Sequence, residues 1–220
     1  MRNHNTLFFV IDMKTSTTKQ LDFWKSEFGN QYTDRNLYNP DSRIPAFKDM
    51  LTGLTIKRIL EVGCNMGNNL VTLSKLNNFQ LIGIEPNSHA AKKGRLQSNL
   101  ISIIEGDGFH IPFSNSYFDL VFTVGVLIHI APQDLPKIID EMYRTSNRYL
   151  LIAEYFSEVD TPIEYRGQKD LLFKRNFKKI FLEVKPGLKC IREGFWGKND
   201  GFDDCHWFLF EKPHNRSNVK

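Results

Sequence analysis

The stretch Glu61-Val62-Gly63-Cys64-Asn65-Met66-Gly67-Asn68-Asn69 decides the fold of this 220-residue chain. It follows an apolar run typical of a strand, and its glycines let the backbone come close to a ligand because glycine has no Cβ. One strand later stands a lone acid, Glu85, at the spacing from which a carboxylate accepts hydrogen bonds from a ribose diol. The presence of Glu85 at this spacing indicates that the turn binds a nucleoside-bearing cofactor. It disfavours the alternative, a generic strand-turn-helix unit.

The spacing of the turn indicates which cofactor is expected. A dinucleotide-binding turn reads G-x-G-x-x-G, and here Asn65 stands where the second glycine would be. The pattern Glu-x-Gly-x-x-x-Gly resembles motif I of class I S-adenosylmethionine-dependent methyltransferases. Their cofactor has no phosphate, so the turn would receive its ribose and its amino-acid end, and S-adenosylhomocysteine would be the product. The cofactor-binding residues that this resemblance implies here are Glu61, Gly63, Cys64, Asn65, Gly67, Asn69, Glu85 and Pro86.

The next two strands agree with this resemblance. The run 101–104 is read as a short strand, and Asp107-Gly108-Phe109 follows it. In that family, an Asp at this position accepts a hydrogen bond from the adenine amino group, and the next residue donates its backbone N–H to the adenine ring. Gly-Asp-Gly is, however, also a plain turn signal. The run 118–124 is apolar, as in a parallel strand buried on both faces. The residues expected to touch the cofactor are Asp107, Gly108 and Phe109 at adenine, and Thr123, Val124 and Gly125 near methionine.

Three side chains are candidates for the catalytic base. His129 follows the fourth strand, at the edge where open α/β sheets bind ligands, and its ordinary pKa is near neutrality. A structural histidine that caps or packs is the alternative. Glu154 ends the fifth strand at the same edge and could supply the base instead, with Tyr155 in the acceptor pocket. His206 begins the last strand, which is expected to be antiparallel and therefore to start near this edge.

The segment before the first strand is expected to form a helical lid. Arg35 could pair with the cofactor carboxylate through a charge-assisted hydrogen bond. Tyr32 or Trp24 could cover the site, although Trp24 is equally consistent with the core of a docked helix. Arg166 is a candidate clamp for an anionic acceptor. Tyr32, Tyr155 and Arg166 are therefore the predicted substrate-binding residues.

Alternating strands and helices predict an α/β fold: a Rossmann-like, seven-stranded, mostly parallel sheet with helices on both faces and an antiparallel last strand. The predicted organisation is a helical cap over 1–52, the main domain over 53–212 and a frayed tail over 213–220. Strands are expected at 57–62, 79–84, 101–104, 118–124, 149–153, 188–196 and 205–211. Helices are expected at 19–30, 46–51, near 67–77 and 88–97, from 132 to 146, and at 169–183, with a loop over 32–45.

Composition excludes several other classes. The chain has a net charge of +4, and its three cysteines form no C-x-x-C pair, so neither a zinc site nor a disulfide framework is expected. The acids lack metal-ligand spacing, and no run approaches the ~20 apolar residues of a membrane span. The basic stretch 169–179 is read as a solvated helix face with a buried phenylalanine stripe (Phe173, Phe177, Phe181), not as a nucleic-acid surface. The protein is expected to be cytoplasmic, with neither nucleic acid nor membrane as partner.

A closer resemblance covers residues 20–212. The set of motifs is similar to the small methyltransferases associated with pseudaminic acid biosynthesis, which implies methylation of an anionic sugar or nucleotide-sugar of nonulosonic-acid or other surface-glycan metabolism. The alternatives are a nicotinamide-dependent sugar oxidoreductase or epimerase, disfavoured by Asn65 and by the lack of a Tyr-x-x-x-Lys pair after the fourth strand, and a non-catalytic cofactor-binding partner. The aromatic closing strands are compatible with a homodimer. The stretches that carry the resemblance are 23–36, 125–130, 146–149, 153–155, 165–170 and 207–212.

Overall fold

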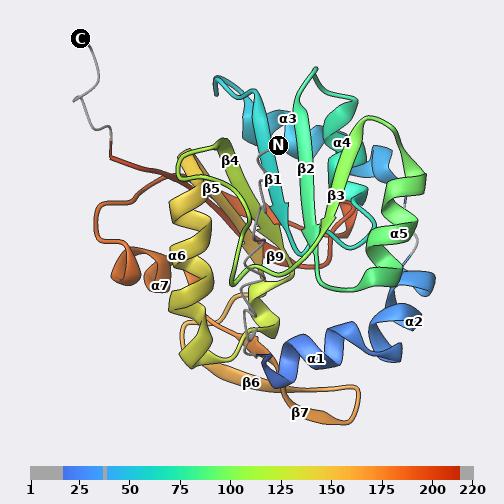
Figure 1. Ribbon diagram of the computed structural model, residues 1–220. Coiled ribbons are helices and arrows are strands. Elements are labelled where there is room, and N and C mark those ends of the chain that lie inside the picture. Colours follow the sequence, from blue (N-terminus) through green and yellow to red (C-terminus); the bar gives the residue numbers. More distant parts are fainter. Residues whose placement is uncertain (1–16, 37–38, 214–220) are drawn as a thin grey trace, which may run out of the picture.

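The computed structural model describes residues 17–36 and 39–213, and it is built around a seven-stranded sheet (Figure 1). Five neighbouring strands are parallel, and β9 is antiparallel to both of its neighbours. The Rossmann-like α/β fold expected from the sequence, with its antiparallel last strand, is confirmed. In order across the sheet the strands are β3 (Ile101–Glu105), β2 (Gln80–Glu85), β1 (Arg58–Val62), β4 (Phe118–Val124), β5 (Ser146–Glu154), β9 (Cys205–Glu211) and β8 (Lys189–Trp196).

Helices cover both faces of this sheet, and a separate apolar cluster fills each interface. In one cluster Phe47 of α3 packs against Phe122 of β4, with ring centroids 6.0 Å apart. In the other, Phe181 of α7 stacks on Phe210 of β9 at 5.4 Å. Burial of apolar surface on both faces is the main stabilising contribution to such a layered fold. One face carries α3 (Ile44–Leu51), α4 (Asn68–Ser74) and α5 (Ser88–Gln97), and the other carries α6 (Leu135–Thr145) and α7 (Phe177–Val184).

The N-terminal segment forms two helices instead of the single helix expected over 19–30. Ser26 ends α1 (Lys19–Lys25) and begins α2 (Glu27–Arg35): its N–H donates to the carbonyl of Phe23 at 3.3 Å, and its hydroxyl accepts from the N–H of Phe28 at 3.2 Å. The prediction that the helix would end at Gly29 was wrong. Gly29 lies inside α2, where a Cβ would stand 1.9 Å from the carbonyl oxygen of Trp24.

The loop expected over 32–45 is also partly helical. Residues 32–35 complete α2, and a short 3-10 helix, η1 (Pro40–Arg43), leads directly into α3. The side chain of Asn39 accepts from the N–H of Asp41 at 3.0 Å and so begins η1. These contacts bring residues of η1 to the carboxyl edge of the sheet, which the sequence did not indicate.

The prediction of a single helix over 169–183 was wrong for the first half of that range. Residues 161–174 form a hairpin, β6 (Thr161–Tyr165) and β7 (Gln168–Lys174). The two residues between the strands, Arg166 and Gly167, have φ of 51° and 74°, as a tight two-residue hairpin turn requires. Phe173 lies on β7, so the phenylalanines at four-residue spacing do not share one helix face.

The real helix in this region begins later. Asn176 caps α7 by accepting from the N–H of Lys179 at 3.0 Å. Phe177 and Phe181 are buried on α7, as expected. Arg175, which the sequence placed on a solvated face, is fully buried between the hairpin and α7.

The hairpin and the N-terminal helices meet at the carboxyl edge of the sheet, where Figure 1 shows α1, α2, β6 and β7 side by side. The side chain of Gln20 donates to the carbonyl of Asp170 at 2.9 Å, and the rings of Phe28 and Tyr165 are 6.1 Å apart. Together they roof the end of the sheet at which β1, β2 and β4 stop. We call α1, α2 and the β6–β7 hairpin the roof.

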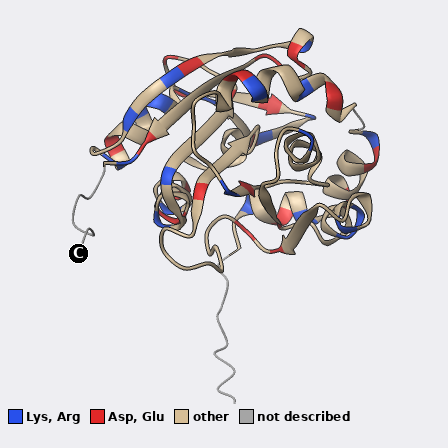
Figure 2. Cartoon of the chain, turned by 90° about the horizontal axis from the view of Figure 1, so that it is seen from above, with Lys and Arg blue, Asp and Glu red and all other residues tan. Residues whose placement is uncertain are grey.

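Several sequence expectations fall partly outside the described residues. The expected cap starts at residue 1 and the expected tail runs to residue 220, whereas residues 1–16, 37–38 and 214–220 are not described. In Figure 2, the positions of Lys and Arg are interspersed with those of Asp and Glu along the ribbon. Within these described ranges, no helix combines the length and the apolar character that crossing a membrane would need.

Candidate functional site

A cavity of about 600 Å³ opens between the carboxyl edge of the sheet and the roof. The glycine-rich turn after β1 forms its floor through Gly63, Cys64 and Asn65. Gly63 has a φ of 72°, and a Cβ there would stand 2.7 Å from a methyl group of Val126. Asn65 also has a positive φ, 49°, so the turn is left-handed at two alternate positions. The predicted turn is therefore brought to the cavity by a backbone that needs glycine.

Gly67, by contrast, does not reach the cavity among the residues described. Its φ is 74°, and a Cβ there would stand 2.8 Å from the side chain of Ile101. Its N–H closes the turn on the carbonyl of Cys64 at 2.8 Å. Gly67 thus shapes the turn and permits close packing on β3, so direct contact with a ligand, as the sequence predicted, is not supported.

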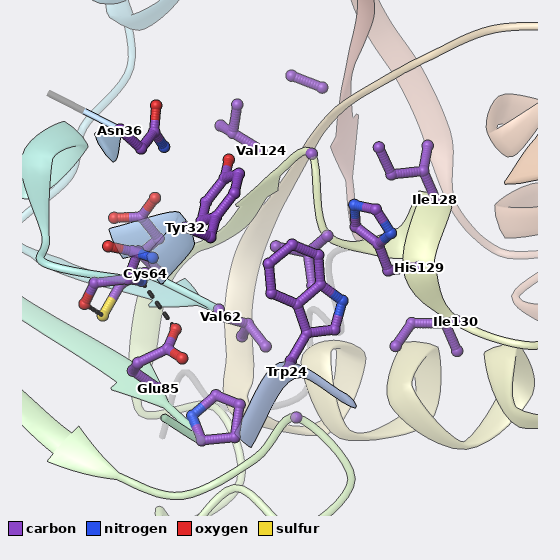
Figure 3. Close-up of a pocket in the computed structure, with 18 of the residues that line it drawn as sticks. Trp24, Tyr32, Asn36, Val62, Cys64, Glu85, Val124, Ile128, His129 and Ile130 are labelled. Atoms are coloured by element: carbon purple, nitrogen blue, oxygen red, sulfur yellow. Dashed lines mark hydrogen bonds between the residues drawn. The ribbon is translucent and has the colours of Figure 1, made fainter. Parts of the chain in front are cut away.

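Glu85 lies at the end of β2 and faces the turn, as Figure 3 shows. One carboxylate oxygen accepts from the N–H of Asn65 at 2.8 Å and the other from the N–H of Asn87 at 2.9 Å. Burial raises the pKa of Glu85 to about 7, while these two N–H groups oppose the rise. Each oxygen keeps a lone pair for a ligand, and Pro86 lines the cavity beside it.

Glu61 forms a second acidic point at the end of β1. Its Oε1 accepts from the side chain of Asn69 at 2.6 Å, and Arg43 donates to the other end of the same amide at 2.6 Å. Its Oε2 is buried with no hydrogen-bond partner among the described residues. Burial raises the pKa of Glu61 to about 8. A buried oxygen without a donor, on a residue that lines the cavity, is suited to a cationic group of a ligand.

The third and fourth strands contribute most of the residues expected of them. Asp107, Gly108 and Phe109 line the cavity, and the Asp107 side chain accepts from the N–H of Phe109 at 2.9 Å. Val124 and Gly125 also line it. The cavity lining within the described chain does not include Thr123, which is fully buried and donates its hydroxyl to Glu154 at 3.2 Å.

His129 lies in the short 3-10 turn η2 (Leu127–His129) that follows β4, and it faces the cavity beside Trp24 (Figure 3). The imidazole packs against the rings of Trp24 and Tyr165, with centroids 4.7 and 5.3 Å away. Its Nδ1 is 2.6 Å from the carbonyl oxygen of Leu171, so Nδ1 carries the proton and donates it. Burial lowers the pKa of His129 to about 4. The ring is therefore neutral near pH 7, and Nε2 holds a lone pair.

The other two candidate bases, Glu154 and His206, lie outside the cavity lining of the described chain. Glu154 is 1 % exposed, and its carboxylate accepts from the backbone N–H groups of Val126, Leu127 and Ile128 at 3.1, 3.0 and 3.2 Å. Burial raises the pKa of Glu154 to about 7, and these N–H groups oppose the rise. His206 is exposed near the start of β9, where its ring lies 4.8 Å from that of Phe156 and 5.3 Å from that of Phe195. A position at the edge of a sheet does not fix the direction of a side chain, so the catalytic roles expected of Glu154 and His206 stay predictions that the cavity lining does not support.

The predicted substrate-binding residues Tyr32, Tyr155 and Arg166 all line the cavity. Tyr155 donates its hydroxyl to Asp203 at 3.3 Å. Burial raises the pKa of Tyr32 to about 12, with further contributions from Tyr165 and Asp203. Arg166 reaches the lining from the tip of the hairpin. These side chains give the cavity both aromatic faces and hydrogen-bonding groups.

Arg35 also lines the cavity, and its guanidinium lies over the rings of Phe28 and Tyr32 at 5.4 and 5.6 Å. Its pairing with a cofactor carboxylate stays a prediction. Among the lining residues that the sequence did not indicate are Arg43, Tyr165 and Asp203, which come from η1, the hairpin and the segment before β9. Within the described ranges, no group of three or more His, Cys, Asp or Glu is arranged to hold a metal ion.

Comparison with known proteins agrees with this geometry. Residues 59–148 match the family model of a methyltransferase domain. The chain is similar to norajmaline N-methyltransferase of Rauvolfia serpentina, at 28 % identity over 117 residues that cover 50 % of this chain and 36 % of that protein. It is also similar to sterol 24-C-methyltransferase of Pneumocystis carinii, at 26 % identity over 44 % of this chain and 27 % of that protein. The chain thus spans about a third or less of the length of these curated relatives.

Solved structures share the fold over most of the chain. Magnesium protoporphyrin IX methyltransferase from Synechocystis, with bound S-adenosylhomocysteine, superposes with a TM-score of 0.67 at 12 % identity, covering 87 % of this chain and 97 % of that one. The 1,6-didemethyltoxoflavin-N1-methyltransferase of Burkholderia thailandensis gives 0.68 at 12 % identity, covering 88 % of each chain. The chain thus shares its fold with these two structures over most of its length, and residues 59–148 match the methyltransferase-domain model.

Proposed function

We propose that this chain is an S-adenosylmethionine-dependent methyltransferase that acts on a small-molecule acceptor. The observation that carries the proposal is the position of Glu85, whose carboxylate lies 2.8 Å from the N–H of Asn65 and faces the cavity beside the glycine turn. On this proposal Glu85 accepts hydrogen bonds from the ribose diol, and Asp107 accepts one from the adenine amino group. The amino-acid end of the cofactor lies along the turn, with its ammonium near the free oxygen of Glu61.

The side chain of Asn65 supports this cofactor over a dinucleotide. It donates to the hydroxyl of Thr33 in α2 at 3.1 Å and accepts from the N–H of Met66 at 2.8 Å. A dinucleotide needs glycine at this point so that the helix N-terminus can approach a pyrophosphate. Because the Asn65 side chain is hydrogen-bonded to both α2 and the turn, it occupies the space through which a pyrophosphate would approach.

The acceptor is proposed to be an anionic sugar or nucleotide-sugar of surface-glycan metabolism. Arg35 and Arg166 line the cavity from two parts of the roof, and both residues are exposed to solvent. A guanidinium can bind a carboxylate or phosphate through two parallel hydrogen bonds. The aromatic rings of Tyr32 and Tyr165 supply apolar faces beside them. The similarity to methyltransferases of pseudaminic acid biosynthesis, residues 20–212, adds the nonulosonic-acid context.

His129 is proposed to take the proton that an oxygen or nitrogen acceptor loses. When bound, the cofactor supplies a methyl group activated by its sulfonium. The chain then has to align the acceptor and exclude water, which the roof does by covering the sheet edge. The neutral imidazole holds its Nδ1 proton on Leu171, so only Nε2 is free to accept a proton.

Formation of S-adenosylhomocysteine tests this function. Purified protein is incubated with S-adenosylmethionine and a panel of free and nucleotide-activated acidic sugars, with the corresponding neutral sugars as controls. Turnover with the acidic sugars alone is expected, and turnover with neutral sugars alone would contradict the acceptor assignment. His129→Asn is expected to lower the rate by about 10²–10⁴-fold, as loss of a general base does. An unchanged rate in this variant would leave His129 as a packing residue.

A further inference from the structure

The turn that carries His129 is held by one buried carboxylate. The N–H groups of Val126 and Leu127 donate to Oε1 of Glu154, and the N–H of Ile128 donates to Oε2. Three successive N–H groups on one carboxylate form an anion-binding nest. The hydroxyl of Thr123 adds a fourth donor at 3.2 Å.

The two ends of this contact come from adjacent strands. Glu154 is the last residue of β5, and β5 pairs in parallel with β4, so that Ala153 lies opposite Val124. The N–H of Gly125 then donates to the carbonyl of Ala153 at 2.9 Å. The chain leaves β4 directly over the Glu154 side chain, and a carboxylate at that point dictates how the next three residues turn.

We propose that Glu154 is a positioning residue for the transfer reaction: its carboxylate fixes η2 so that the His129 imidazole keeps Nδ1 on Leu171 and presents Nε2 to the acceptor. This inference rests on the proposed role of His129. Glu154 acts through the backbone, because its side chain is buried behind the turn and lies outside the cavity lining of the described chain. A displacement of about 1 Å in a reacting group can lower a rate 10²-fold, so the turn needs such an anchor.

The fixed tautomer of His129 is the second part of this arrangement. The 2.6 Å contact joins Nδ1 of His129 to the carbonyl of Leu171 in β7. The guanidinium of Arg175, which directly follows β7, donates to the carbonyl of Ile130 at 3.0 Å and so ties the residue after His129 to the same segment. The turn is thus held by Glu154 on one side and by β7 on the other.

The test replaces Glu154 by Gln, which keeps the size of the side chain but removes its charge and sets an NH₂ against a backbone N–H. The matched control is Asp119→Asn. Asp119 also accepts two backbone N–H groups, those of Lys57 and Arg58 at 2.8 and 2.9 Å, but at the opposite end of the sheet. Both variants are expected to lose stability. Only Glu154→Gln is expected to disturb His129.

The primary readout is ¹⁵N NMR of the histidine ring, which reports the tautomer without any turnover. The wild type and Asp119→Asn are expected to show His129 with its proton on Nδ1, and Glu154→Gln is expected to lose this signature. The rate with any acceptor found in the panel should fall at least 10-fold in Glu154→Gln, while the dissociation constant for S-adenosylhomocysteine stays within 2-fold. Identical His129 signals in all three proteins would overturn the inference.

The test still decides about Glu154 if the Gln variant does not fold or if no acceptor is found. If Glu154→Gln does not fold, Thr123→Val removes one donor from the same carboxylate, and it is expected to shift the same His129 signals. Unchanged signals in Thr123→Val would then count against the inference. If no acceptor is turned over by the wild type, the proposed function fails, whereas the NMR comparison still decides whether Glu154 positions the ring.

Discussion

Replacing Glu61 by Gln is expected to stabilise the unliganded protein while weakening its affinity for the cofactor. Glu61 is 2 % exposed, and one of its oxygens has no hydrogen-bond partner in the described part of the chain. A Gln at this position can still accept from the side chain of Asn69 through its amide oxygen. It cannot ionise, and it cannot offer a negative charge to the cofactor ammonium.

The size of the stabilisation follows from the pKa of Glu61, which burial raises from 4.5 to about 8. The folded protein therefore holds this proton between pH 4.5 and pH 8 whereas the unfolded chain releases it, so this carboxyl lowers stability as the pH rises through that range. Each pH unit corresponds to about 1.4 kcal/mol, which gives an advantage of about 3 kcal/mol for Glu61→Gln at pH 7. The advantage is expected to vanish near pH 4.5.

Thermal unfolding from pH 4.5 to pH 8 measures this difference. An advantage of that size corresponds to roughly 6–12 °C in Tm at pH 7 for a protein of this length. The control is Glu141→Gln: the Arg144 guanidinium 2.7 Å away lowers the pKa of Glu141 from its ordinary 4.5, so the stability that this carboxylate contributes is lost only as the pH falls below about that value. This variant should therefore be less stable than wild type by a nearly constant amount between pH 5 and pH 8. Titration with S-adenosylhomocysteine should show a roughly 10- to 150-fold weaker affinity for Glu61→Gln, the effect of losing a charged hydrogen bond worth about 1.5–3 kcal/mol. A Glu61→Gln protein that is less stable than wild type at every pH would refute the reasoning.

Three further substitutions test other parts of the fold and site. Glu85→Ala should weaken S-adenosylhomocysteine binding by about 1.5–3 kcal/mol in calorimetry, and an unchanged dissociation constant would remove Glu85 from the site. Gly29→Ala places a Cβ 1.9 Å from the carbonyl of Trp24, so faster hydrogen exchange is expected in α1 and α2, and wild-type protection would contradict this packing. Gly63→Ala combines a φ of 72° with a contact of 2.7 Å to Val126, and chemical denaturation should show a loss of at least about 1–2 kcal/mol, since left-handed backbone alone costs that much. A stability equal to wild type would refute that strain.

Much of the central sheet could be predicted because its signals are local. The turn at Gly63 and the acid at Glu85 mark the ends of two strands, and the apolar run 118–124 marks a third. Parallel pairing then brings these ends to one edge without further information. Several residues that line the cavity could therefore be named from their place in the chain.

The roof was harder to predict because it depends on contacts between distant segments. The four-residue spacing of Phe173, Phe177 and Phe181 mimics one helix, whereas β7 is defined by its pairing with β6. The sequence held a local signal in the dipeptide Arg166-Gly167, both of whose residues adopt positive φ. Such a turn is recognised only when the flanking residues are already read as strands.

The site residues that were missed and the placement of the Glu154 side chain escaped prediction for two different reasons. Arg43, Tyr165 and Asp203 reach the cavity from segments outside the main sheet motifs, so no spacing rule could link them to it. Glu154 was expected to face the acceptor because β5 ends at the right edge. Its side chain is instead buried beneath the turn before His129, since three backbone N–H groups there need an acceptor.

The most direct test of the cofactor assignment is calorimetric titration of the purified protein with S-adenosylhomocysteine, with NAD as the control ligand. Micromolar binding of S-adenosylhomocysteine and no binding of NAD is the expected result. Binding of NAD without S-adenosylhomocysteine would contradict the account, because a pyrophosphate would then have to approach the turn past the side chain of Asn65.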